Sequence, residues 1–240
     1  MKKFSVKFFT VIASILLIGL CFSSCDYGSD DSGSGSVTPT PVDTGFSGNF
    51  YLADLKYNLD DENPTASSYF YLYKFERNGD VTVIRDGMNY NKVLSNGFYN
   101  DHYSSKSTYT YDKTNSTVTI SDGRKGSIDS DGNLKIGSNT YKKTAASDFY
   151  IHTSAKYIKA RGDISGIKSC ALNYFLMEDN KYTLRKWSIA DSNPSDSTEK
   201  GTFTKSDSTV TFTSSTGSTS TGTITDGGSL TYEDDSYYHR

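Results

Sequence analysis

The side chains that could do chemistry are few in this chain and stand far apart. The three histidines, His102, His152 and His239, do not have the spacing of a zinc-binding motif. The chain also lacks the Gly-x-Ser-x-Gly elbow, the His-Glu-x-x-His motif and the glycine patterns of phosphate loops and dinucleotide sites. We therefore expect no catalytic residue, no metal and no cofactor, and keep an enzyme only as a remote alternative.

One short motif matches a recognition chemistry. Arg161, Gly162 and Asp163 form an Arg-Gly-Asp triplet, which integrins bind through a metal-coordinated carboxylate and a separate cation. We expect the triplet in an exposed connection between two strands that continues through Ile164 to Ile167. A possible adhesion loop and an ordinary loop with a chance triplet are the two interpretations.

Residues 69–75 read Tyr-Phe-Tyr-Leu-Tyr-Lys-Phe and place large side chains on both faces of a strand. A strand of a small barrel needs apolar residues only on its inner face, so one face is in surplus and predicts a contact surface. That surface could stack sugars or pack against a second domain. The possible aromatic contact face comprises Tyr69, Tyr71, Tyr73 and Phe75, with the single tryptophan Trp187.

The first 25 residues have the order of a secretory signal peptide. Three lysines precede an apolar run of 15 residues, Phe8 to Phe22, and Ser23 and Ser24 follow it before Cys25. The run is shorter than the roughly 20 residues of a transmembrane helix. This segment resembles a bacterial lipoprotein signal, with Phe22 where the usual motif has leucine.

That resemblance implies cleavage after residue 24 and acylation of Cys25, for example by palmitate. The protein would then be exported and lipid-anchored to the inner or outer bacterial membrane, in the periplasm or on the cell surface. An ordinary cleaved signal with an incidental cysteine is the alternative. Cys170 is the remaining thiol, and its strand face, shared with Leu172 and Tyr174, predicts a buried and inert side chain.

Charge excludes some partners. Without the three lysines of the signal, 22 basic side chains stand against 28 acidic ones, a net charge of −6. Such a chain will not bind nucleic acid or anionic membrane lipids by electrostatics. Its membrane attachment therefore depends on the acyl chains of the lipid anchor. Asp26 to Gly45 consists mainly of Gly, Ser, Thr, Pro and Asp, and we expect a flexible tether with a reach of roughly 25 Å.

The remainder is an internal duplication. Identical residues recur at an offset of 96, and the pairs are Gly126/Gly222, Ile128/Ile224, Gly132/Gly228, Leu134/Leu230 and Tyr141/Tyr237. A period this long predicts two tandem domains, residues 46–144 and 147–240, and not a solenoid.

Turn signals every 6–12 residues divide each copy into short alternating runs. In the first copy they are Asp60–Pro64, Asn78-Gly79, Asp86-Gly87, Lys113–Asn115, Asp122-Gly123, Asp131-Gly132 and Gly137–Asn139. Seven turns imply about eight antiparallel strands, and such a meander removes its edges by closing. The predicted fold class is all-β, with two tandem small antiparallel meander barrels.

Ser47-Gly48-Asn49-Phe50 and Phe75–Asp80 resemble segments of bacterial lipocalin-like lipoprotein domains. The resemblance implies a calyx for a small apolar molecule. Bulky side chains, namely Phe50, Tyr71, Tyr73 and Phe75, instead predict a filled interior in the first barrel. We therefore expect a membrane-anchored, non-catalytic envelope lipoprotein that binds a small apolar ligand or an envelope protein, with a surface adhesin as the alternative.

Overall fold

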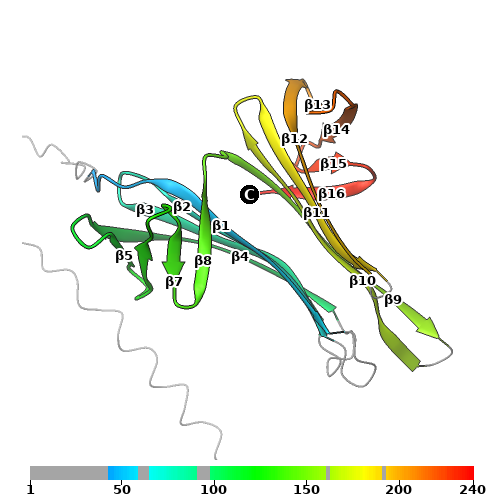
Figure 1. The fold of residues 1–240 in the computed structure, drawn as a ribbon, viewed down its shortest axis with the longest axis horizontal. Helices are drawn as coiled ribbons and strands as arrows, with labels where there is room; N and C mark the ends of the chain where they lie inside the picture. The colour runs from blue at the N-terminus through cyan, green and yellow to red at the C-terminus, as the bar shows by residue number, and fades with distance from the viewer. Residues whose placement is uncertain (1–42, 59–64, 91–97, 161–162, 191–192) are drawn as a thin grey trace, which may run out of the picture. The chain divides into compact units, whose positions relative to one another are not determined.

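The computed structural model describes residues 43–58, 65–90, 98–160, 163–190 and 193–240, and it confirms the all-β class with two tandem closed barrels (Figure 1). The first barrel comprises β1 (Gly48–Asn58), β2 (Thr65–Phe75), β3 (Asp80–Tyr90), β4 (Phe98–Asp112), β5 (Thr117–Ile120), β6 (Lys125–Ile128), β7 (Leu134–Ile136) and β8 (Asn139–Thr144). The second comprises β9 (Asp148–Ala160), β10 (Asp163–Glu178), β11 (Lys181–Ala190), β12 (Asn193–Ser206), β13 (Thr209–Ser214), β14 (Thr219–Ile224), β15 (Leu230–Tyr232) and β16 (Asp235–His239). Among the described residues, no helix is long and apolar enough to cross a membrane.

Each barrel is an antiparallel meander that closes between its first and last strands. In the first barrel Phe50 of β1 pairs with Lys143 of β8, and in the second Tyr150 of β9 pairs with His239 of β16. Where the barrel is closed, this pairing satisfies backbone groups that would otherwise lie at two exposed edges.

The strands of each barrel differ greatly in length. β1 to β4 have 11 to 15 residues, whereas β5 to β8 have three to six. The short strands close only one end, because β8 pairs with residues 49–51 of β1 and β5 with residues 109–112 of β4. Beyond that end β1 to β4 continue as an open sheet, and β9 to β12 repeat this arrangement (Figure 1).

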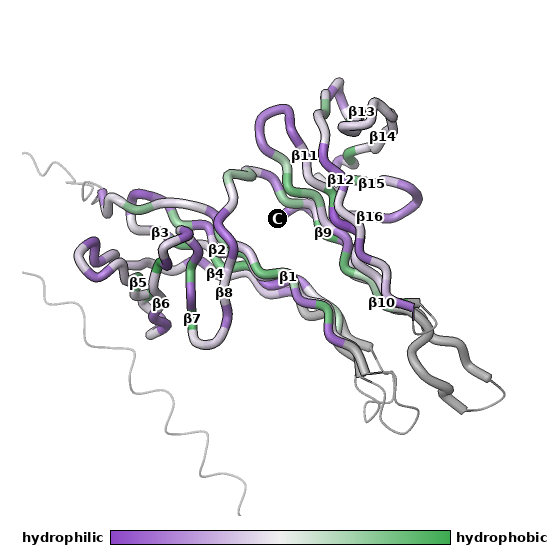
Figure 2. Tube along the Cα trace, viewed as in Figure 1, coloured by the Kyte–Doolittle hydropathy of each residue, from purple (hydrophilic) through white to green (hydrophobic). Residues whose placement is uncertain are grey.

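Local sequence explains the short hairpins. In β5, Val118 and Ile120 are buried and alternate with threonines, as a half-buried strand requires. The expected turns at Asn78-Gly79, Asp122-Gly123 and Asp131-Gly132 are present, and each glycine has a positive φ. Figure 2 shows that turns such as those between β10 and β11 and between β15 and β16 are hydrophilic.

The turn expected at Asp86-Gly87 is wrong, because both residues lie inside β3. The Tyr69 ring crosses the backbone at Gly87, where an added Cβ would lie 2.4 Å from the Tyr69 ring atom Cδ1. Glycine here therefore permits a close approach between neighbouring strands instead of a turn. Asp86 is buried and contacts the second barrel, as described below.

The exposed connection expected at Ile164 to Ile167 is also wrong. These residues belong to β10, where Asp163 pairs with Ala160 and Ile164 with Lys159. The register shifts between Ile164 and Ile167 and again between Ile167 and Ser169. The small residues Ser165 and Gly166 thus lie at a β-irregularity within the strand pair.

Aromatic side chains fill the closed end of each barrel. The core of the first consists of Phe50, Tyr73, Phe75, Val81, Val83, Tyr109, Val118, Ile120, Leu134 and Tyr141. The core of the second consists of Tyr150, Phe175, Met177, Tyr182, Leu184, Val210, Phe212, Leu230, Tyr232 and Tyr237. Every one of these residues is at most 7% exposed. In the first barrel, Phe50, Tyr73 and Phe75 occupy the interior as the sequence predicted, whereas Tyr71 is only partly buried and packs against this core.

Candidate binding site

The two faces of β2 have different partners. Tyr73 and Phe75 are buried in the first barrel core, and Tyr71 packs against that core. Phe70 and Leu72, on the opposite face, contact the second barrel. The sequence assigned the contact surface to the tyrosine face, but packing between the barrels uses the other face.

A third hydrophobic cluster joins the barrels, and we call it the junction cluster. It comprises Phe70, Leu72 and Ile84 of the first barrel, the connecting Ala146, and Phe149, Ile151, Leu172 and Tyr174 of the second. Trp187 packs against it, which is the domain contact that the sequence offered as an alternative to sugar stacking. The Phe70 ring lies 5.1 Å from the Tyr174 ring and 6.2 Å from the Phe149 ring.

Polar contacts surround the junction cluster. Arg240 donates from Nε to Asp86 Oδ2 at 2.7 Å, and Lys74 Nζ donates to the carbonyl oxygen of Arg240 at 2.9 Å. Lys74 also lies 5.2 Å above the Phe149 ring. Burial lowers the pKa of the Lys74 ammonium, and the carboxylates of Asp148 and Glu76 oppose this shift.

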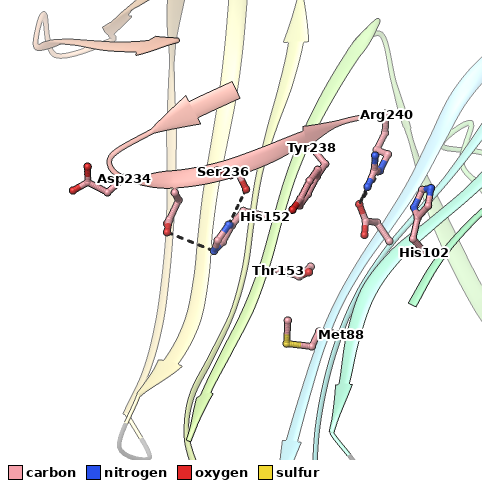
Figure 3. Close-up of a pocket in the computed structure, with 10 residues that line it drawn as sticks. Met88, His102, His152, Thr153, Asp234, Ser236, Tyr238 and Arg240 are labelled. Carbon is pink, nitrogen blue, oxygen red and sulfur yellow. Dashed lines mark hydrogen bonds and ion pairs between the residues drawn. The ribbon is translucent and has the colours of Figure 1, made fainter. Parts of the chain in front are cut away.

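A cavity of about 510 Å³, which we call the junction cleft, lies beside the junction cluster (Figure 3). Several of its polar groups have partners within the protein: Asp86 pairs with Arg240, and His152 Nδ1 donates to the Ser236 carbonyl oxygen at 3.0 Å. His152 Nε2 also lies 3.6 Å from Asp235 Oδ1. Because Asp86 and Arg240 already pair with each other, this ion pair offers little to a charged ligand in the junction cleft.

We call the end of each barrel next to the start of its first strand the mouth. In the first barrel, the residues just ahead of β1 close this mouth. Phe46, two residues before β1, stacks on Tyr111 at 4.6 Å between ring centres and on Phe50 at 5.8 Å. Its ring also contacts the edges of Phe75 and Tyr109. We call this aromatic residue the plug of the first barrel.

Hydrogen bonds hold the backbone on either side of the plug. Thr44 donates its backbone N–H to the Arg77 carbonyl at 2.8 Å, and the Tyr109 hydroxyl donates to the Phe46 carbonyl at 2.5 Å. The Thr44 and Tyr109 hydroxyls are 2.7 Å apart. Phe46 is therefore fixed by backbone as well as by ring contacts.

The mouth of the second barrel contains a cavity of about 290 Å³. Its floor is apolar and its rim is charged, and the lining comprises Tyr150, Met177, Phe203, Val210, Ile224 and Gly228 with Asp148, Lys205 and His239. At the rim His239 Nε2 lies 2.9 Å from Asp148 Oδ1. Burial, and then the Asp148 charge, raise the pKa of Tyr150, which therefore remains a neutral phenol at physiological pH.

The other residues singled out by sequence lie elsewhere. Cys25, Arg161 and Gly162 are outside the described residues, and Asp163 is the first residue of β10. Cys170 is buried, as expected, and burial raises the pKa of its thiol to about 11. Within the described ranges, no group of three or more His, Cys, Asp or Glu side chains could hold a metal ion.

Sequence reasoning missed the second-barrel cavity. The duplication contained its signal, because aligning the two copies by strand register places Met177 opposite Phe75 and Lys205 opposite Tyr111. Both substitutions remove an aromatic ring from the mouth of the second barrel.

No known protein family, curated protein or solved structure matches this chain.

Proposed function

We propose that this is a lipid-anchored, non-catalytic binding protein of the bacterial cell envelope, with a small apolar ligand held at the mouth of the second barrel. The apolar cavity there is the observation that carries the proposal. Its volume is at the lower end of the range for small-molecule sites, and its charged rim over an apolar floor suits a ligand with one polar end.

Anchoring is supported by the order of residues before Cys25, from the basic start to the small residues at the cut. Cys25→Ala is expected to move the protein from the membrane fraction to the soluble fraction. Retention of this variant in membranes would contradict the lipid anchor, and it would leave the binding site to be judged separately.

Two methionines allow ligand binding to be located. The chain has three methionines, of which Met1 belongs to the signal, Met88 lines the junction cleft and Met177 lines the second-barrel cavity. In ¹³C-methyl spectra of the purified mature protein, we expect at least one of octanoate, 3-cyclohexylpropionate and 3-phenylpropionate to shift the Met177 signal saturably. A shift of Met88 instead, or of neither signal, would contradict ligand binding at this site.

A further inference from the structure

The strand pairings of the two barrels correspond at their mouths, so residues of one mouth have counterparts by register in the other. Tyr109 pairs with Ile120 and Phe203 with Phe212 at corresponding places in the two barrels. The backbone confirms this correspondence, because Tyr109 N–H donates to the Gly79 carbonyl as Phe203 N–H donates to that of Asn180.

The plug of the first barrel therefore defines a place in the second. Phe46 contacts four aromatic rings, those of Phe50, Phe75, Tyr109 and Tyr111. Their counterparts by register are Tyr150, Met177, Phe203 and Lys205. All four counterparts line the second-barrel cavity, so this cavity lies where the first barrel holds the Phe46 ring.

Among the described residues of the second barrel, no side chain fills this place. Phe46 stands two residues before β1, and Ala146 stands two residues before β9. Ala146 lacks a ring and belongs to the junction cluster. The duplication has thus kept the ring-sized site while replacing the residue that fills it.

We propose that the second-barrel cavity binds a single aromatic ring that carries an anionic tail, a proposal that rests on the binding function proposed above. Tyr150 and Phe203 offer ring contacts, and the Met177 thioether offers a sulfur–aromatic contact. The volume of about 290 Å³ exceeds the ~150 Å³ cavity that is known to hold benzene.

The charged residues at the rim of the cavity indicate which tail the ligand carries. Lys205 occupies the register position of Tyr111, so an exposed ammonium stands where the first barrel stacks a ring on Phe46. Asp148 is next to His239, which offsets its charge when the imidazole is protonated. A carboxylate on the ligand can therefore meet Lys205 while the ring occupies the apolar floor.

Matched probes test the ring. 3-Phenylpropionate and 3-cyclohexylpropionate share the same tail and the same number of ring carbons, but the ring is planar and aromatic in the first and saturated in the second. Binding is read from the Met177 methyl shift. We expect the aromatic acid to bind about threefold more tightly, because ring contacts add to burial. Equal or tighter binding of the saturated acid or of octanoate would overturn the aromatic assignment and leave the proposed binding function intact, whereas binding of none of the three would overturn both.

Two variants test the geometry. Lys205→Met should weaken 3-phenylpropionate binding about tenfold, whereas Lys106→Met, a change at an exposed lysine of the first barrel, should leave it unchanged. Phe46→Ala should open a second ring-sized site in the first barrel, but Tyr111 stands there in place of Lys205, so this site should bind 3-phenylpropionate at least about tenfold more weakly than the second barrel. An unaltered affinity in Lys205→Met, or a folded Phe46→Ala protein whose first barrel binds as tightly as the second, would overturn the proposal.

The same titration separates two sources of the ligand. N-acetylglycyl-phenylalanine presents the ring and carboxylate as the end of a peptide, and 3-phenylpropionate presents them as a free acid. Tighter binding of the peptide supports a polypeptide end as the natural ligand, and tighter binding of the free acid supports a small metabolite. Failure of both to shift Met177 overturns the aromatic site.

Discussion

Asp86 shows how much one residue contributes to the contact between the barrels. Its side chain is 11% exposed, and that of its partner Arg240 is 18% exposed. Removing the carboxylate would leave the guanidinium without its counter-ion in a poorly solvated place.

We expect Asp86→Ala to lower the free energy of unfolding by about 2–3 kcal/mol. Urea denaturation followed by circular dichroism measures this change. Asp226→Ala, at an exposed turn residue, is the matched control and should change stability little. A similar result for both variants would mean that the Asp86–Arg240 pair is not stabilising.

The Cys170 thiol should be nearly unreactive in the folded protein. Its side chain is buried, and its pKa of about 11 leaves little thiolate at pH 8. Residues 25–240 contain one other cysteine, Cys25, and its proposed acylation would leave Cys170 as the one free thiol of this range. We expect alkylation by iodoacetamide to be slow in buffer and rapid in denaturant; equal rates would show that the thiol is accessible in the native state.

At the scale of single elements, glycines permit the barrels to close tightly. A Cβ at Gly222 in β14 would lie 2.8 Å from Leu230 Cδ1 and 2.9 Å from the Thr231 carbonyl oxygen. The counterpart Gly126 in β6 is equally confined by β7. Neither position has a positive φ, so the requirement is for space and not for backbone freedom.

We expect Gly222→Ala to destabilise the protein by about 1–3 kcal/mol, because the neighbouring strand must move. Gly227→Ala is the control, since a Cβ there would meet only Thr225 Oγ1 at 3.8 Å. Thermal melting of both variants measures the effect. Equal melting temperatures would contradict the tight packing of β14 against β15.

The hairpins were predictable from local sequence, and the long strands were less so. Asn-Gly and Asp-Gly pairs with positive φ at glycine marked real turns at Gly79, Gly123 and Gly132. Asp86-Gly87 has the same sequence signal, but there glycine accommodates the Tyr69 ring. Sequence alone does not distinguish these two uses of glycine, because the second depends on the neighbouring strand.

At the scale of the whole molecule, buried tyrosines should make stability sensitive to alkaline pH. Burial raises the pKa of Tyr51 to about 12 and raises the pKa values of Tyr73 and Tyr237 as well. An unfolded tyrosine has a pKa of about 10. The unfolded chain therefore loses protons first as pH rises above about 10.

We thus expect the free energy of unfolding to be insensitive to these groups below about pH 9 and to fall as pH rises from about 10 toward 12. Urea titrations at pH 8, 10 and 11 measure the trend. Absorbance at 295 nm should show fewer ionised tyrosines in the folded protein than in the unfolded one at pH 11. Equal ionisation in both states would contradict the burial of these phenols.

The tandem arrangement was predictable because the duplication repeats residues in order, from Gly126/Gly222 to Tyr141/Tyr237. The contact between the barrels was predictable only as a surplus of aromatic residues on β2. Strand alternation separates two faces but does not say which face is inside, so Phe70 and Leu72 were not identified as the contact. The cavity of the second barrel exists because Ala146, the counterpart of Phe46, has no ring to fill it. This correspondence becomes visible only once the strand register is known.

Thr44 and Phe46 also determine how mechanical force enters the molecule. A pull on the chain ahead of Asp43 is borne first by the Thr44–Arg77 hydrogen bond and the Phe46 ring. β1, by contrast, is paired with β2 along all of its 11 residues and resists extraction collectively. Tension on the proposed tether would withdraw the Phe46 ring before the sheet yields, and a protein under load would then present two open mouths instead of one.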